Sequence, residues 1–211
     1  MKTASALIKI FDKLFSFYGP QHWWPGDTPF EVAVGAILTQ NTNWSNVEKA
    51  IRNLKKEKVL NATALHRLPT EKLSTLIRPA GYFNIKAKRL KSFIDFLMHN
   101  YIGSMKKMAK KDTASLRQEL LNIHGIGPET ADSILLYALD KPVFVIDAYT
   151  KRVLSRHGIM GYNAAYDEYQ GLFHQALDED IQLFNEYHAL FVMVGKDYCK
   201  PRPLCEECPL K

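Results

Sequence analysis

Apolar residues recur at three- and four-residue spacing along most of the chain, which is the period of an α-helix with one buried face. Residues 30–40 are nearly all apolar, which predicts a helix buried on every side. Only residues 143–146 have the composition of a strand, so the pattern predicts an all-α fold. The first helix is expected to end at Tyr18-Gly19-Pro20, after the apolar positions Ala6, Leu7, Ile10, Phe11, Leu14 and Phe17.

The same spacing predicts further helices, and local signals mark some of their ends. Asn43 can cap the helix that follows it, because its side-chain oxygen can accept from a first-turn amide. The lysine run over residues 106–111 is expected to be a solvated connector. The predicted helices cover residues 43–54, 61–67, 70–77, 84–100, 113–122, 128–139 and several segments from Asp147 to about Gly195.

Composition limits the class of protein. Of the 211 residues, 46% are hydrophobic and 24% charged, as in an ordinary globular protein, which excludes wholesale disorder. No apolar run approaches the roughly 20 residues of a membrane helix, and the lysines and aspartate near the N-terminus do not fit a secretion signal. The net charge of +6 favours a polyanionic partner. We therefore expect a soluble cytoplasmic protein with no membrane partner.

Residues 121–131 contain the most informative motif, in which Gly125 and Gly127 flank Ile126. Glycines allow a tight reversal and expose backbone amides, and Pro128 suits the first turn of a following helix. Free amides at a helix N-terminus form an anion site that matches a DNA phosphate. A plain turn between two packed helices explains the same spacing, so the motif alone leaves both interpretations open.

Four further blocks accompany this motif: residues 38–42, 80–88 and 141–147 and a terminal cysteine group. With the tryptophan pair that begins at residue 23, the set runs in order to residue 208. Together they resemble the helix-hairpin-helix DNA glycosylases of the endonuclease III superfamily, although residues 141–147 lack the family's loop glycine. The resemblance implies a monomer with a six-helix barrel (30–141) and a second lobe (1–29 with 142–211). Double-stranded DNA with a damaged base would lie in the groove between these lobes.

The resemblance also implies that Asp147 is essential for base excision. Cleavage of an N-glycosidic bond develops positive charge on the sugar, which a carboxylate stabilises. Asp147 can equally cap the helix after it. Bifunctional members carry a lysine eighteen residues earlier, where this chain has Glu129, an acid that also suits a helix N-terminus. A carboxylate cannot form a Schiff base, so we expect a monofunctional enzyme, unless Lys141 or Lys151 substitutes.

Trp23, Trp24 and Pro25 resemble the tryptophan-rich segment of the 3-methyladenine branch of this superfamily. Alkylated purines carry positive charge, and an aromatic wall attracts a cation by about 0.5–2 kcal/mol. The three residues are therefore the candidate base pocket, although tryptophans in such a loop can also be core. Phe30, Trp44 and Tyr149 are weaker candidates.

By the same resemblance, Gln40 is expected to fill the gap left by a flipped base and Tyr82 to contact the opposite strand. Each has an ordinary alternative, Gln40 as a helix C-cap and Tyr82 as packing beside Gly81. The basic series Lys86, Lys88, Arg89 and Lys91 is expected to be a solvated face, which can add phosphate contacts.

Cys199, Cys205 and Cys208 resemble the first three ligands of the superfamily's [4Fe-4S] loop, with the first gap one residue shorter. Such a cluster takes four thiolates, and a fourth cysteine is absent from this chain. A cluster with another fourth ligand, zinc, or no metal at all remain open at this point.

The leading hypothesis is hydrolytic removal of alkylated purines such as 3-methyladenine from DNA. One alternative is an endonuclease III-like glycosylase for oxidised, deaminated or mismatched pyrimidines. Another is a noncatalytic helix-hairpin-helix module, against which the position of Asp147 speaks.

Overall fold

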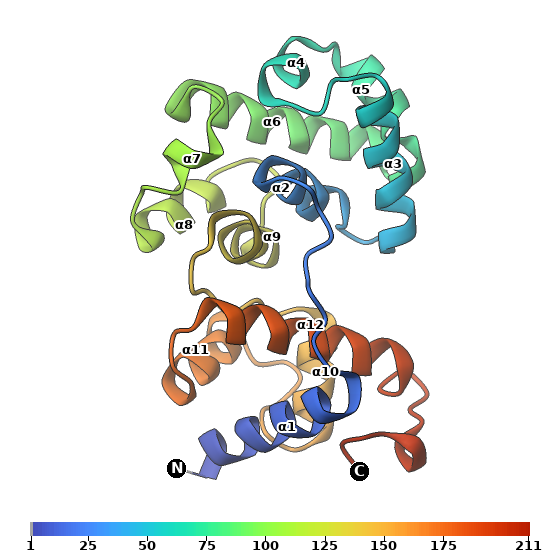
Figure 1. The fold of residues 1–211 in the computed structure, drawn as a ribbon, viewed down its shortest axis with the longest axis vertical. Coiled ribbons are helices and arrows are strands. Elements are labelled where there is room, and N and C mark those ends of the chain that lie inside the picture. Colours follow the sequence, from blue (N-terminus) through green and yellow to red (C-terminus); the bar gives the residue numbers. More distant parts are fainter. Residues whose placement is uncertain (1) are drawn as a thin grey trace. The chain divides into compact units, whose positions relative to one another are not determined.

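The computed structural model describes residues 2–211, with side chains described from residue 4 onward. Contacts within the chain separate two compact units (Figure 1), unit 1 (residues 1–23 and 142–211) and unit 2 (24–141). All regular structure over residues 2–211 is helical, which confirms the predicted all-α fold. In the same range, no helix is long and apolar enough to cross a membrane.

Unit 2 is built around α2 (Pro29–Leu38), whose residues from Glu31 onward are all buried. In Figure 1, α2 lies between α6 and α9, in agreement with its contacts to both. The other helices of the unit are α3 (Trp44–Lys56), α4 (Ala62–Arg67), α5 (Thr70–Leu76), η1 (Arg78–Ala80), α6 (Phe83–Tyr101), α7 (Met105–Met108), α8 (Thr113–Leu121), α9 (Pro128–Ser133) and η2 (Ile134–Ala138).

Side-chain caps set where several of these helices begin. Thr28 accepts a hydrogen bond from the Glu31 amide at the start of α2, and Pro29 occupies the first helical turn. Asn43 caps α3 through the Asn46 amide at 3.1 Å, as the sequence predicts. The start of each of these two helices is therefore set by a hydrogen bond between residues three apart in the sequence.

Two segments of unit 2 differ from the sequence-based expectation. The lysine run contains a short helix, α7, in which Met105 and Met108 are buried and the lysines between them face solvent. The helix predicted over 128–139 is α9, followed by a π-helical turn, Ile134–Ala138. That wider turn brings Tyr137 against the ring of Trp24, a tertiary contact that helical periodicity does not encode.

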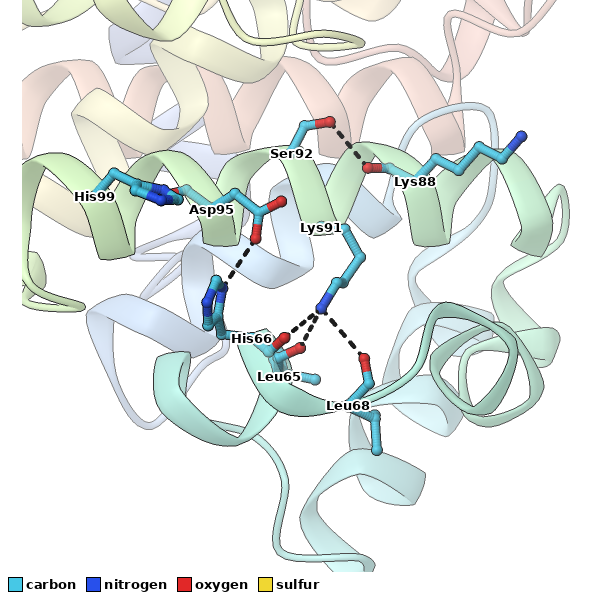
Figure 2. A network of polar contacts seen from close by, with 8 residues as sticks. All are labelled: Leu65, His66, Leu68, Lys88, Lys91, Ser92, Asp95 and His99. Carbon is cyan, nitrogen blue, oxygen red and sulfur yellow. Dashed lines mark hydrogen bonds and ion pairs between the residues drawn. The ribbon is translucent and has the colours of Figure 1, made fainter.

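The basic series on α6 is not a solvated face. Lys91 donates from Nζ to the carbonyls of Leu65, His66 and Leu68 at 2.6–3.2 Å, and so caps the C-terminal end of α4 (Figure 2). Lys86 is buried, and Arg89 binds another side chain, described below. Of the four, only Lys88 is exposed, because Lys86 and Lys91 donate to backbone carbonyls and Arg89 donates to a side chain.

Unit 1 contains α1 (Lys2–Tyr18), α10 (Ala148–Arg156), α11 (Tyr166–Ala176), α12 (Ile181–Asp197) and η3 (Cys205–Glu207). Helix α12 contacts α1 and α10, and α1 ends at Tyr18 as predicted. The aromatic core of the unit includes Phe144 and Phe173, whose rings stack with centroids 3.6 Å apart.

The strand-like segment Val143–Ile146 is buried but forms no strand. Side chains of α11 take the place of a strand partner. The Phe144 amide donates to His174 Nε2, and Gln170 donates from Nε2 to the Phe144 carbonyl. The strand-like composition of this segment reflects its burial. Its backbone groups at Phe144 are hydrogen-bonded to side chains of a helix instead of to a neighbouring strand.

Candidate functional site

The glycine motif forms a tight hairpin between α8 and α9, with Pro128 in the first turn of α9. Gly125 has φ +83°, a conformation that L-residues rarely adopt. A Cβ at this position would lie 2.2 Å from Cγ of Arg89, so only glycine fits beneath that side chain. Ile126 is buried in the loop, whereas a Cβ at Gly127 would meet no atom within 4 Å. The loop is thus anchored at Gly125 and Ile126 and open at Gly127.

An ion pair joins the two helices of the hairpin. Arg117 on α8 donates from Nε and Nη2 to the two carboxylate oxygens of Asp132 on α9, at 2.7 and 3.0 Å. Asp132 is fully buried. Bidentate geometry of this kind is strong and directional, and it fixes the angle at which the hairpin presents its loop.

Gln40 lies against the hairpin instead of extending from the surface. Its Nε2 donates to the Gly125 carbonyl and to Thr130 Oγ1, both at 3.0 Å. Its Oε1 accepts from Arg89 Nη1 at 2.5 Å. The amide at the expected wedge position is therefore bound at both its oxygen and its nitrogen, and insertion into a duplex would require it to exchange these partners.

Tyr82 has the opposite character, with 69% of the residue exposed. It directly precedes α6 and follows Gly81, and its backbone is left-handed at φ +45°. A non-glycine residue in this region costs energy, so the turn is held by its surroundings. The structure presents Tyr82 to solvent at a constrained turn, where packing against Gly81 does not account for its ring.

Trp24 belongs to an aromatic cluster inside unit 2. Its ring meets Trp44 edge-on with centroids 5.3 Å apart, and Tyr137 at 5.2 Å. Gly35 in the middle of α2 makes room for this cluster, because a Cβ there would lie 3.3 Å from Trp24 Nε1 and 3.4 Å from Trp44 Cη2. Trp44, a weaker candidate from sequence, is thus an integral part of this cluster.

The boundary between the two units falls between Trp23 and Trp24. In unit 1, the Nζ of Lys196 lies 5.7 Å from the centroid of the Trp23 ring, within cation–π range. Pro25 is exposed in unit 2. The adjacent tryptophans therefore have separate structural settings. Tyr149 packs within unit 1, where Gly195 leaves room for its ring.

Asp147 is the N-cap of α10, and its carboxylate is almost fully buried. Oδ1 accepts from the Thr150 amide at 2.7 Å, and Oδ2 lies 3.6 Å from Nε2 of the buried His188. Burial acts to raise the pKa of Asp147, but His188 and the Thr150 amide outweigh it and hold the pKa below its ordinary value. The capping role is confirmed, and the carboxylate is at the same time kept ionised in a buried position.

Glu129 lies in the first turn of α9 and is exposed, where an acid complements the helix dipole. The two alternative lysines are occupied within their own units. Lys141 donates from Nζ to the Lys111 carbonyl at 2.8 Å. Lys151 donates to the Ala164 carbonyl at 3.2 Å and lies over the ring of Tyr169.

The cysteine loop is held by arginines of α10. Arg156 donates to the Cys199 thiol at 3.3 Å and to the Lys200 carbonyl at 2.6 Å, and Arg152 donates to the Cys199 carbonyl. Burial raises the pKa of the Cys208 thiol, and the nearby thiols of Cys199 and Cys205 raise it further.

These three thiols do not complete the four-thiolate set of a cubane cluster. Across the described part of the chain, no group of three His, Cys, Asp or Glu side chains is placed to hold a metal ion. The donors do not fit the cluster suggested by the resemblance, and the chemistry below uses no step through it.

Residues 34–178 match the model of the HhH-GPD superfamily of base excision DNA repair proteins. The chain belongs to this superfamily. The match covers the hairpin, the Gln40 loop and Asp147, and it confirms the endonuclease III-like assignment made from the sequence. As an HhH-GPD protein, the chain is a DNA repair glycosylase by family.

Two relatives illustrate the range of this HhH-GPD family. A Methanocaldococcus jannaschii protein, provisionally named a DNA repair glycosylase, is 52% identical over 207 residues, which are 97% of this chain and 94% of that protein. Endonuclease III of Thermotoga maritima is 30% identical over 184 residues, 87% of this chain and 81% of that enzyme.

Solved structures share the fold. The H. pylori 3-methyladenine DNA glycosylase MagIII, bound to 1,N6-ethenoadenine, aligns with a TM-score of 0.78 and 31% identity, over 90% of this chain and 97% of that one. An endonuclease III–DNA complex aligns with a TM-score of 0.83 at 22% identity, over 100% of this chain and 94% of that one. The second likeness establishes the fold alone.

Sequence reasoning did not single out His188, Arg117 or Asp132. His188 lies in the middle of an apolar helix, where a lone histidine carries no local signal. Arg117 and Asp132 are fifteen residues apart and meet only when the hairpin forms. Gly35 was the available signal for the aromatic cluster, because a glycine inside a buried helix indicates close approach of a bulky side chain.

Proposed function

We propose that the chain is a monofunctional glycosylase that hydrolyses the N-glycosidic bond of alkylated purines, 3-methyladenine first, in double-stranded DNA. The observation that carries this proposal is the buried, ionised carboxylate of Asp147 together with Glu129 at the position of the family's lysine. The first supplies charge stabilisation, and the second leaves no amine there to form a Schiff base.

In this mechanism the carbon–nitrogen bond breaks with its electron pair going to the base. Positive charge develops on the sugar, and the Asp147 carboxylate stabilises it and orients a water molecule. The water oxygen bonds to C1′, its proton is released, and the strand stays intact. The Thr150 amide and His188 keep the carboxylate charged, so their role is to position and ionise it.

The preference for alkylated purines is supported by the aromatic residues. These purines carry positive charge and already have a weak glycosidic bond, so stacking surfaces and one carboxylate suffice. The cluster of Trp24, Trp44 and Tyr137 and the ring of Trp23 offer such surfaces in their respective units. The 31% identity to a 3-methyladenine DNA glycosylase points in the same direction.

DNA would be held by the hairpin loop of Gly125, Ile126 and Gly127, which is open at Gly127, and by Tyr82 at its exposed turn. The net charge of +6 adds a salt-dependent attraction to any duplex. We expect the protein to act as a monomer in the cytoplasm.

The test is incubation of the protein with methylated duplex DNA, followed by chromatography of the released bases without heat or alkali. We expect free 3-methyladenine, unbroken strands and no protein–DNA adduct after borohydride reduction. No release of methylpurine, with release of uracil or an oxidised pyrimidine from duplexes that carry those lesions, would overturn the specificity and favour the pyrimidine alternative. Binding with no release from any lesion would overturn catalysis.

A further inference from the structure

Lys86 on the first turn of α6 is almost completely buried, with 1% of the residue exposed. Its Nζ donates to the carbonyl of Leu38 at 2.8 Å and to the carbonyl of Ala80 at 2.7 Å. Burial, with a smaller effect from the charge of Arg89, lowers the pKa of Lys86 to about 8. A buried ammonium is costly unless hydrogen bonds compensate it, so these two carbonyls account for its position.

Both carbonyls lie at helix C-termini, where backbone acceptors lack intrahelical partners and favour a cation. Leu38 ends α2, two residues before Gln40, and Ala80 ends η1, two residues before Tyr82. The Lys86 amide also donates to the Tyr82 carbonyl at 2.9 Å. One residue therefore holds the ends of two helices, one leading to Gln40 at the expected wedge position and the other to Tyr82, the expected contact with the opposite strand.

The next turn of α6 continues this arrangement. Arg89 binds the side chain of Gln40 through Nη1, and its stem lies where a Cβ of Gly125 would be. The same face of α6 thus contacts the Gln40 loop, the Tyr82 turn and the hairpin. All of these contacts lie within unit 2.

We propose that Lys86 is a positioning residue that sets the Gln40 loop and the Tyr82 turn at the spacing needed for both to act on one distorted base step. Lys86 itself is too deeply buried to reach a phosphate, so it acts through the two carbonyls. The inference rests on the proposed function, because it takes Gln40 and Tyr82 as the residues that act on DNA.

Lys91 provides a matched control on the same helix. It also donates from Nζ to carbonyls at a helix C-terminus, that of α4 (Figure 2), but α4 leads to neither Gln40 nor Tyr82. Lys86→Met and Lys91→Met each remove one ammonium from carbonyls and keep a chain of similar length. A purely structural role predicts the same behaviour for both variants.

The experiment measures base unstacking with 2-aminopurine placed beside an abasic-site analogue in duplex DNA, at saturating protein. Urea unfolding of each variant measures how much free energy of unfolding it has lost, so that the loss of unstacking can be compared with the loss of stability. We expect Lys86→Met to lower the fluorescence change about tenfold, and Lys91→Met to leave it within twofold of wild type. Lys86→Arg, which keeps two donors, is expected to restore much of the signal. If Lys86→Met does not fold, Lys86→Gln takes its place.

The inference would be overturned if the fluorescence change decreased in both variants in proportion to their loss of stability. Normal unstacking by Lys86→Met would overturn it as well. Base release separates this from the proposed function. Wild type that releases 3-methyladenine while both variants unstack alike contradicts only the role of Lys86. Wild type that releases no methylpurine, with unstacking lost in Lys86→Met alone, contradicts only the proposed specificity. Wild-type protein that leaves the base stacked contradicts the role of Lys86, whichever base it releases.

Discussion

Replacement of His188 by leucine tests how the buried carboxylate is kept ionised. Asp147 is 9% exposed, and burial raises its pKa, while the His188 ring 3.6 Å from Oδ2 and the Thr150 amide lower it. Removal of a polar partner from a buried acceptor costs about 1–3 kcal/mol. The variant therefore loses about that much stabilisation of the ionised carboxylate, and the pKa of Asp147 rises.

The assay is single-turnover base release from pH 4.5 to 8, corrected for release without enzyme. The ionised form of Asp147 is the active one, so a raised pKa moves the acidic limb of the rate profile to higher pH. The rate at pH 8 should change much less. His66→Leu, which removes the half-exposed partner of Asp95, is the matched control and should leave the limb in place.

An acidic limb at the wild-type position in His188→Leu would refute this reasoning. A uniform loss of rate at every pH would do the same, because it would show that His188 supports packing and not ionisation.

Three further predictions concern the hairpin and the buried lysine. Gly125→Ala strains a backbone with φ +83° and drives a methyl group into Arg89. We expect the free energy of unfolding to fall by about 1–2 kcal/mol and duplex binding, measured by fluorescence anisotropy, to weaken. Unchanged affinity for the duplex would contradict the role of the loop. Asp132→Ala removes the buried partner of Arg117 and should cost about 3 kcal/mol in urea unfolding, whereas a loss below about 1 kcal/mol would contradict the structural role of that pair. Burial lowers the pKa of Lys86 from 10.5 to about 8, so wild type should gain unfolding free energy relative to Lys86→Met as pH rises from 8 to 10, by at most about 3 kcal/mol; a constant difference would be inconsistent with that pKa.

Much of the fold follows from local sequence signals. The apolar period, Asn43 as a cap, and the Gly-Pro pair after Tyr18 predict helices whose ends agree with the structure to within a few residues. The strand-like composition of residues 143–146 was misleading, since a buried extended segment and a buried strand have the same residue types. The side-chain partners from α11 that replace a strand are distant in sequence and leave no local pattern.

The site was predictable where a motif is contiguous and unpredictable where it depends on tertiary contacts. Gly125 and Asp147 lie in motifs that the chain displays directly. The burial of Lys86 was not predictable, because a lysine at the start of a basic helix looks the same whether it meets water or two carbonyls. Likewise, the binding of Gln40 to the hairpin requires Gly125 and Thr130 to come within 3.0 Å across 85 and 90 residues.

The most direct test of the account compares base release by wild type and Asp147→Asn on duplex DNA containing 3-methyladenine. Asparagine caps a helix as well as aspartate does, so α10 should be preserved while the charge is lost. We expect wild type to release the base with unbroken strands, and the variant to be slower by at least about a hundredfold while it still unfolds cooperatively. Release by Asp147→Asn at the wild-type rate would show that this carboxylate does not carry the reaction.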